Sequence, residues 1–138
     1  MIMRIEHIGI AVADGDATRR IFDRLLGKTC DKTENVTSEG VKTTFYQLEN
    51  SKLELLEDID PTGGTIRKFL ARRGEGMHHV ALEVDDIHNE IARLKAEGFT
   101  FVNDHPKAGA DNKLICFLHP KSTAGVLVEL CQEQPPRR

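Results

Sequence analysis

The feature that most constrains the fold is an internal repeat. The segment IEHIGIAV at residues 5–12 matches MHHVALEV at residues 77–84 in its order of apolar and polar positions. Each copy runs into an acidic turn and then into a stretch with helical spacing of apolar residues, which are Ala17, Ile21 and Leu25 in one copy and Ile87, Ile91 and Leu94 in the other. Each stretch stops at a glycine, Gly27 or Gly98, the residue that favours a left-handed helix end. The repeat therefore predicts two strand–helix units.

Short β-branched or alternating segments follow each predicted helix. They are Val41–Leu48 and Lys52–Glu57 in the first half, and Leu114–Leu118 and Gly125–Cys131 in the second. Residues 65–71 predict a short linking helix, and the boundary between the copies lies near Gly74. The fold class expected is α+β, with two tandem βαβββ modules at about residues 1–74 and 75–132 of a single domain, residues 1–138.

Composition narrows the class of protein only slightly. A chain of 138 residues suits one domain, and a net charge of −3 gives no sign of a nucleic-acid or membrane partner. Three cysteines without a CxxC pattern favour a reducing compartment over a disulfide framework. We expect a cytoplasmic protein, or a mitochondrial matrix protein if a transit peptide was removed.

Two histidines occupy matched positions in the repeat. Side chains alternate across a strand, so Ile8, Ile10 and Val12 share one face, and His7 lies on the other face among small residues. The second copy repeats this arrangement with His79. A histidine among small residues, opposite a branched apolar face, is unusual for a core and suits the floor of a cavity.

Two glutamates fall on the same side as these histidines. Alternation places Glu54 opposite Leu53 and Leu55, and it places Glu129 opposite Val126, Val128 and Leu130. A carboxylate in the middle of a strand is costly to bury unless it is paired or binds a metal. Two imidazoles and two carboxylates form a donor set suited to Zn, Ni, Co, Mn or Fe(II).

The simpler interpretation of any one of these residues is structural. A single strand histidine is more often a hydrogen-bonded core residue, and a single strand glutamate more often faces solvent. Four such residues at matched places in a repeat favour the metal site. The remaining histidines are weaker candidates, since His78 is expected to pack on the apolar side, His88 to be solvated, and His105 and His119 to lie in turns before proline. Cys131 shares the predicted face of Glu129.

Four segments make the chain resemble the vicinal oxygen chelate superfamily and, within it, the methylmalonyl-CoA epimerase family. They are IEHIGIAV, KLELLE, GEGMHHVALEVDDI and FLHPKSTAGVLVEL. The resemblance implies that the modules form a cup-shaped mixed sheet around one divalent ion. The family's metal-ligand pattern falls on His7, Glu54, His79 and Glu129. Family members often carry glutamine where this chain has Glu54, and the match there needs a small gap.

The activity implied is that of an isomerase acting on a 2-methyl-branched acyl-CoA. It removes a proton from the carbon between a thioester and a carboxylate, passes through a metal-stabilised enolate, and returns a proton to the opposite face. The resemblance makes Glu129 a ligand and the base, with Glu54 as its counterpart. Some epimerases carry a further acid where this chain has Val41-Lys42-Thr43-Thr44. The second proton carrier is therefore open between Glu54, a lysine and metal-bound water.

Two other functions remain open on the sequence. A glyoxalase I-like lactoylglutathione lyase uses the same ligand types, but such proteins usually have a DPDG-type turn where this chain has HPKSTAG. A non-catalytic, antibiotic-sequestering protein of the same fold generally lacks the ligands. The partners expected are an acyl-CoA substrate and a second copy of the chain in a homodimer. Lys107, Lys113 and Lys121 are candidates to hold phosphates or a carboxylate, although solvated surface lysines are the simpler interpretation.

Overall fold

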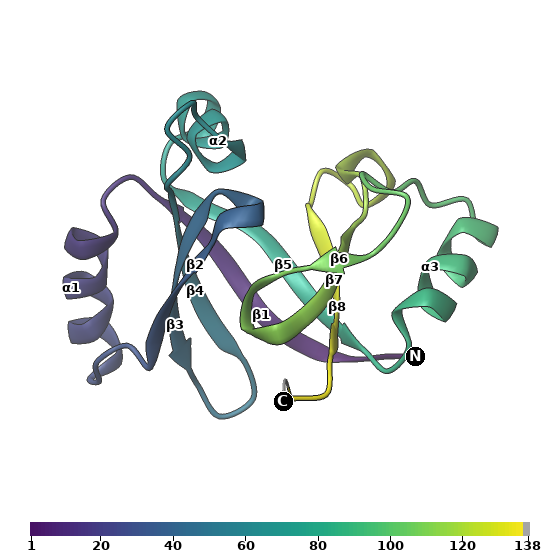
Figure 1. Cartoon of the computed structure of the whole chain (residues 1–138), viewed down its shortest axis with the longest axis horizontal. Coiled ribbons are helices and arrows are strands. Elements are labelled where there is room, and N and C mark those ends of the chain that lie inside the picture. The colour runs from purple at the N-terminus through teal and green to yellow at the C-terminus, as the bar shows by residue number, and fades with distance from the viewer. Residues whose placement is uncertain (137–138) are drawn as a thin grey trace. The chain divides into compact units, whose positions relative to one another are not determined.

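The computed structural model describes residues 1–136 and contains the predicted module twice (Figure 1). The first copy comprises β1 (Ile2–Val12), α1 (Gly15–Leu26), β2 (Lys32–Val36), β3 (Val41–Gln47) and β4 (Lys52–Asp58). The second comprises β5 (Gly76–Val84), α3 (Ile87–Ala96), β6 (Lys107–Ala108), β7 (Lys113–Phe117) and β8 (Val128–Glu133), and α2 (Thr65–Arg73) links the copies. Three 3₁₀ turns, Thr37–Glu39, Ala110–Asn112 and Pro120–Ser122, complete the chain. The predicted α+β fold of two βαβββ modules is confirmed.

The chain divides into two compact units whose borders cut through β1 and β5. Unit 1 contains Met1–Glu6 and the chain from His79 onward, and unit 2 contains His7–His78. The first residues of β1 therefore belong with the second module, and the first residues of β5 belong with the first. Of the helices within residues 1–136, none has the length and apolarity needed to span a bilayer.

The sheet of unit 2 runs β2-β3-β4-β1. β3 is antiparallel to both neighbours, and β4 is parallel to β1. Figure 1 shows α1 against this sheet, where its side chains join a core built on Val12, Tyr46 and Leu55. On the other face, Ile66 and Phe69 of α2 pack with Ala11, Val41 and Leu56. The face that carries Ala11, His7 and Glu54 is called the histidine face of unit 2.

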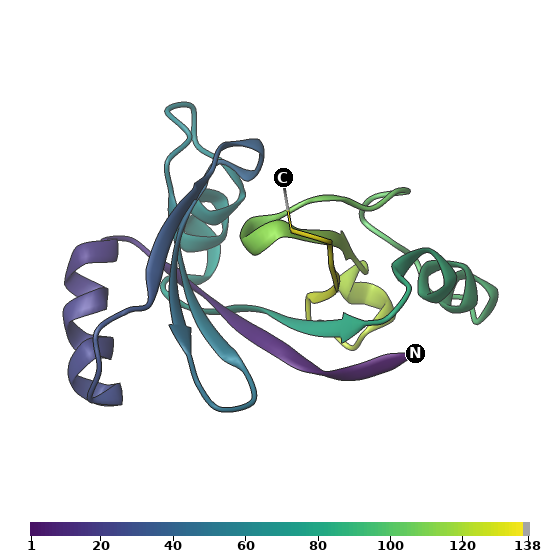
Figure 2. The ribbon, with the colours of Figure 1, turned by 60° about the horizontal axis from the view of Figure 1, so that its bottom comes forward.

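Unit 1 repeats this arrangement with the order β6-β7-β8-β5 (Figure 2). β7 is antiparallel to both β6 and β8, and β8 is parallel to β5. One face packs on α3 through a core containing Val84, Ile87, Ile91, Leu94, Cys116, Leu118 and Leu130. The other, the histidine face of unit 1, carries His79, Glu129 and a small cluster of Ala81, Ile115 and Cys131.

The acidic turns after β1 and β5 are helix N-caps. The Asp14 carboxylate accepts the backbone N–H of Ala17, and Asp86 accepts that of Asn89. Such caps satisfy donors that the first helical turn leaves without partners. Gly27 ends α1 in the left-handed conformation, as predicted.

The prediction that α1 packs on the sheet through Ile21 and Leu25 is wrong. Ile21 and Leu25 are 53% and 69% exposed, whereas Phe22 and Leu26 contact the core. Tyr46 explains the rotation, because its hydroxyl donates to the Asp23 carboxylate at 2.6 Å. A fully buried tyrosine needs a partner for its O–H group, and this bond turns the Asp23 side of the helix toward the sheet. In α3 the predicted face of Ile87, Ile91 and Leu94 is buried and confirmed.

The predicted strands agree with the structure within a few residues, except at the two edges and before β8. β2 and β6 had no individual prediction, and β8 begins at Val128 instead of Gly125. Val126 is 50% exposed and lies outside the strand. The turn that precedes it keeps Ala124 and Gly125 at positive φ, which the alternation rule does not detect.

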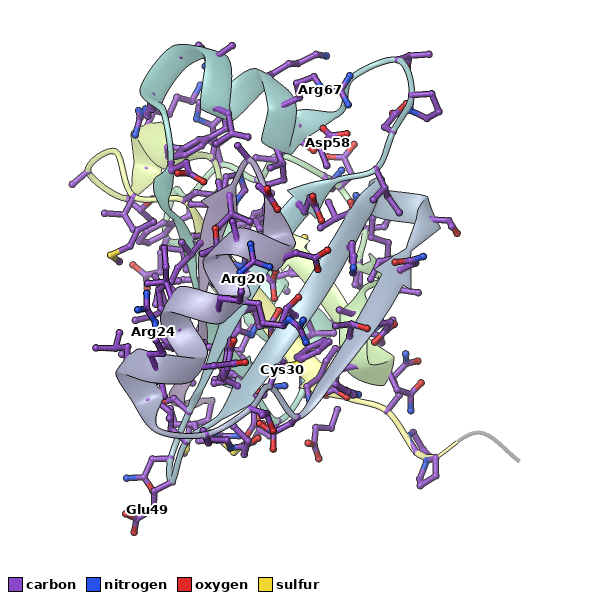
Figure 3. All side chains as sticks on the ribbon, turned by 90° about the vertical axis from the view of Figure 1, so that its left-hand side faces the viewer. Arg20, Arg24, Cys30, Glu49, Asp58 and Arg67 are labelled. Atoms are coloured by element: carbon purple, nitrogen blue, oxygen red, sulfur yellow. The ribbon has the colours of Figure 1, made fainter. Side chains whose placement is uncertain are left out.

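Asp58, at the end of β4, organises the loop that leads into α2. Its carboxylate accepts the backbone N–H groups of Asp60, Gly64 and Arg67 at 2.8, 2.8 and 2.9 Å. The helix N-cap is Gly64, which has no side chain, so Asp58 caps the helix from a distance (Figure 3). Burial alone would raise the pKa of the Asp58 carboxyl, but the three backbone donors and the Arg67 charge hold that pKa below its usual value.

Replacing Asp58 should cost stability in a pH-dependent way. Asp58→Asn should lower the free energy of unfolding at pH 7 by about 1–3 kcal/mol, because it weakens charge-assisted hydrogen bonds. The folded-state pKa is depressed, so the stabilisation is present above the unfolded pKa of about 4 and is lost as pH falls through the folded pKa. Urea unfolding from pH 7 to pH 3 measures this. Glu49→Gln, at an exposed hairpin, is the control, and a wild-type advantage that does not change with pH would contradict the account.

Candidate active site

In unit 2, the register of β1 and β4 brings one histidine to one glutamate. Gly9 pairs with Glu54, and His7 lies two residues earlier on the same face. His7 Nδ1 is 3.1 Å from Glu54 Oε2. Both residues are buried, with exposed fractions of 5% and 3%. Gly9, itself buried, has no side chain, so the position beside the carboxylate in the register carries no Cβ atom.

In unit 1, the same arrangement recurs between β5 and β8. Ala81 pairs with Glu129, and His79 lies two residues earlier. His79 Nε2 is 3.4 Å from Glu129 Oε1, and both residues are again buried. The structure thus brings His7 to Glu54 within unit 2 and His79 to Glu129 within unit 1. The faces predicted from strand alternation agree with both arrangements.

A phenylalanine stands beside each glutamate, and sequence reasoning missed both. Phe45 of β3 pairs with Glu54, and Phe117 of β7 pairs with Glu129. The Phe117 ring meets the His79 ring edge-on, with centroids 5.6 Å apart. These rings exclude water from one flank of each carboxylate. Their matched positions in TFYQ and CFLH were the available signal.

Lys52 is a third residue that the sequence did not single out. It lies two residues before Glu54 on the same face, directly beside His7 in the register, and only 5% of it is exposed. Its ammonium is 3.8 Å from Glu54 Oε2, the oxygen that also faces His7. It also lies over the Phe45 ring, at 5.4 Å from the centroid. A buried cation in this position offsets the charge of the carboxylate.

Of the three lysines considered for phosphate or carboxylate binding, one is not a surface residue. Lys107 and Lys121 are exposed, but Lys113 is 6% exposed and pairs with Glu133 at 2.9 Å. The register of β7 and β8 places Lys113 opposite Glu133, on the histidine face of unit 1. The interpretation of Lys113 as a solvated surface lysine is therefore wrong.

The remaining histidines and Cys131 have other surroundings. His78 packs edge-on against Phe69 at 4.9 Å, and burial lowers its pKa to about 4. His88 and His105 are exposed, while His119 accepts the backbone N–H of Lys121. Cys131 does share the face of Glu129, but it is fully buried there and its thiol donates to the carbonyl of Leu82. Burial raises the pKa of the Cys131 thiol, so it stays protonated.

The chemistry of the two pairs fits a divalent metal ion. Imidazole nitrogen and carboxylate oxygen are ligands that first-row transition metals accept. A carboxylate buried to this degree is costly without a cation, which a metal supplies. Each of the four residues belongs to a buried group of possible metal ligands, and the group that contains Glu54 consists of Glu6, His7 and Glu54.

Comparison with known proteins places the chain in a family. The model of the glyoxalase/bleomycin resistance protein/dioxygenase superfamily matches residues 6–117. The mitochondrial methylmalonyl-CoA epimerase of Dictyostelium discoideum is 38% identical over 94% of this chain and 78% of its own length. The ethylmalonyl-CoA/methylmalonyl-CoA epimerase of Cereibacter sphaeroides is 38% identical over 96% of this chain and 99% of its own.

A solved structure gives the same result. A variant of Streptomyces coelicolor methylmalonyl-CoA epimerase, in complex with 2-nitronate-propionyl-CoA, superposes with a TM-score of 0.92 and 33% identity over 98% of this chain and 100% of that chain. Similarity of this extent, in both sequence and structure, indicates a shared family and not only a shared fold. The chain belongs to the glyoxalase/bleomycin resistance protein/dioxygenase superfamily and, within it, to the methylmalonyl-CoA epimerase family.

Proposed function

We propose that the chain is a methylmalonyl-CoA epimerase that interconverts the two configurations at the carbon between the thioester and the carboxylate. The observation that carries the proposal is the duplicated His–Glu pair, buried once in each unit of a chain from this family. An acyl-CoA substrate is supported by the Streptomyces coelicolor relative, which was solved with 2-nitronate-propionyl-CoA. A cytoplasmic homodimer remains a prediction.

We infer that His7, Glu54, His79 and Glu129 hold one divalent ion. A bound ion would neutralise the negative charge that develops on the substrate's thioester and carboxylate oxygens when the proton leaves. Glu54 is suited to the role of a permanent ligand, because Lys52 and His7 both face its Oε2 atom. Lys52 brings a positive charge to within 3.8 Å of that oxygen.

Glu129 is the residue best placed to move a proton in unit 1. Ala81 and Phe117 flank it in the register, so a small buried side chain lies on one side and an aromatic ring lies on the other. His79 orients its Oε1 atom. A carboxylate oriented in this way accepts the proton of the central carbon and then returns a proton to it. Lys113 lies on the same face, where its ammonium is paired with Glu133.

The protein should bind about one divalent ion per chain. The reason is that two buried imidazoles and two buried carboxylates are stabilised by a cation. Elemental analysis after dialysis, followed by calorimetric titration of the metal-free protein with Co²⁺ or Mn²⁺, measures the stoichiometry. Binding should also raise the denaturation temperature. The absence of a saturable site would leave only a metal-independent function.

Substitutions at two adjacent histidines should distinguish a metal ligand from a residue that only packs. His79→Ala should lose metal and epimerisation, whereas His78→Ala should keep metal and lose mainly stability, because His78 packs on Phe69. Metal content, turnover and urea unfolding should be measured on both variants. If His78→Ala loses the metal and His79→Ala retains it, the assignment of the strand faces is wrong.

Glu129→Gln should distinguish the proton-transfer role of Glu129 from its role as a ligand. The amide keeps an oxygen donor but cannot accept a proton from carbon at neutral pH. Turnover should fall by roughly two to four orders of magnitude at full metal occupancy. Occupancy and rate are measured on one preparation, with the exposed Glu97→Gln as the control. A variant that is metal-loaded and nearly as active as the wild type would move proton transfer to another residue.

A further inference from the structure

Lys52 carries a buried charge that the proposed mechanism does not use. The residue is 5% exposed, although a lysine is almost never buried to this degree unless its charge is paired. Within unit 2 it lies on the histidine face, two residues before Glu54 and beside His7 in the register. A lysine on a strand usually extends its flexible stem so that the ammonium reaches solvent. Burial of this ammonium therefore indicates a role inside the face.

The Lys52 ammonium lies beside the carboxylate of Glu54. Its Nζ atom is 3.8 Å from Glu54 Oε2, and it lies over the Phe45 ring at 5.4 Å from the centroid. Phe45 pairs with Glu54 between β3 and β4, so the ring, the ammonium and the carboxylate lie together. The face of an aromatic ring attracts a cation, which helps to keep the ammonium in this place. The same Oε2 atom is 3.1 Å from His7 Nδ1.

The carboxylates near His7 need positive charge to be buried. Glu54 and Glu6 are both 3% exposed, and both belong to the same group of possible metal ligands as His7. Arg4 approaches Glu6 Oε2 to 3.7 Å, and Lys52 approaches Glu54. A buried carboxylate that loses such a cation is strongly destabilised, because its charge is then poorly compensated in a medium of low dielectric constant. Lys52 therefore stabilises the fold through Glu54.

The same carboxylate is a ligand under the proposed function, on which the following inference rests. Glu54 would then share its negative charge between the Lys52 ammonium and a divalent ion. Two positive charges would be added close to the one that Lys52 already holds there. Like charges at such short range repel strongly inside a protein. Lys52 and the ion thus compete for one carboxylate.

We propose that Lys52 is a positioning residue with two opposite effects on this site. Its ammonium compensates Glu54 and so stabilises the metal-free protein, and the same ammonium lowers the affinity of the site for divalent ions. In the metal-free protein it holds the carboxylate beside His7 in the buried face. When an ion binds, repulsion from the ammonium offsets part of the attraction to Glu54. The bound ion is therefore more readily exchanged than the donor set alone would allow.

Lys52→Met tests both effects, because it removes the charge and keeps a side chain of similar length. The metal-free variant should unfold at a lower urea concentration than the metal-free wild type. The same variant should bind Co²⁺ and Mn²⁺ more tightly, by roughly tenfold or more in calorimetric titration. The two ions should gain alike, because they carry the same charge. A lysine with only a structural role would instead give losses in both stability and affinity.

Two matched variants serve as controls. Lys52→Arg keeps a positive charge and should bind both ions nearly as the wild type does. Lys32→Met removes another lysine over the Phe45 ring, at 4.9 Å from the centroid, but Lys32 is exposed and water screens its charge. This variant should show neither effect. If metal-free Lys52→Met does not fold, Lys52→Gln takes its place with the same expected gain in affinity.

The double variant Lys52→Met/Glu54→Gln shows whether the lysine acts through Glu54. Each single change removes one charge of the pair and leaves the other buried, whereas the double change removes both. In the metal-free form, the double variant should therefore be more stable than the sum of the two single losses predicts. Additive losses would show that Lys52 does not compensate Glu54, and would contradict the proposal.

Three further results would overturn the proposal. They are a folded Lys52→Met with wild-type or weaker affinity for both ions, metal-free Lys52→Met as stable as the wild type, and a gain of equal size in Lys32→Met. These results leave the proposed function standing if the wild type binds an ion. A wild-type protein without a saturable metal site would reject the proposed function, and the competition with it. Circular dichroism is measured on every preparation.

Discussion

Each unit buries a carboxylate beside an imidazole in the middle of a sheet, and the neighbouring residues accommodate that costly contact. The glutamate and the histidine come from parallel strands, so the register fixes their separation without any loop. Gly9 and Ala81 keep the adjoining position small, while Phe45 and Phe117 close the opposite flank. On the reverse face, apolar residues of the same strands pack on a helix, which makes the strands rigid supports.

Much of this arrangement could be predicted because strands have a side-chain period of two. Once the repeat fixed which residues of β1 and β5 were equivalent, the faces of His7 and His79 followed from alternation, as did those of Glu54 and Glu129. The same rule could not find Phe45 or Phe117 as neighbours of the glutamates. Their proximity depends on which strands pair and in which register, and the residues of one strand do not reveal this.

The wrong predictions, for the face of α1 and for Lys113, also have physical causes. Four apolar residues, Ile21, Phe22, Leu25 and Leu26, crowd the end of α1, so helical periodicity alone permits more than one inward face. The Tyr46–Asp23 hydrogen bond, a contact between elements distant in sequence, selects the face. Lys113 was misjudged for a similar reason, because its long side chain and its partner Glu133 allow a charged residue to be buried in a strand. Helix ends were easier, because Asp14, Asp86 and Gly27 act locally.

The proposed function rests on a divalent ion held by the buried histidines and glutamates and on proton transfer at one carbon of the substrate. A single configuration of methylmalonyl-CoA, incubated in D₂O with the metal-loaded protein, tests this most directly. Nuclear magnetic resonance and chiral analysis then follow the central carbon. The account predicts that the opposite configuration appears and carries deuterium from the solvent at that carbon. Metal-loaded protein that leaves the isomer unchanged and unlabelled would contradict it.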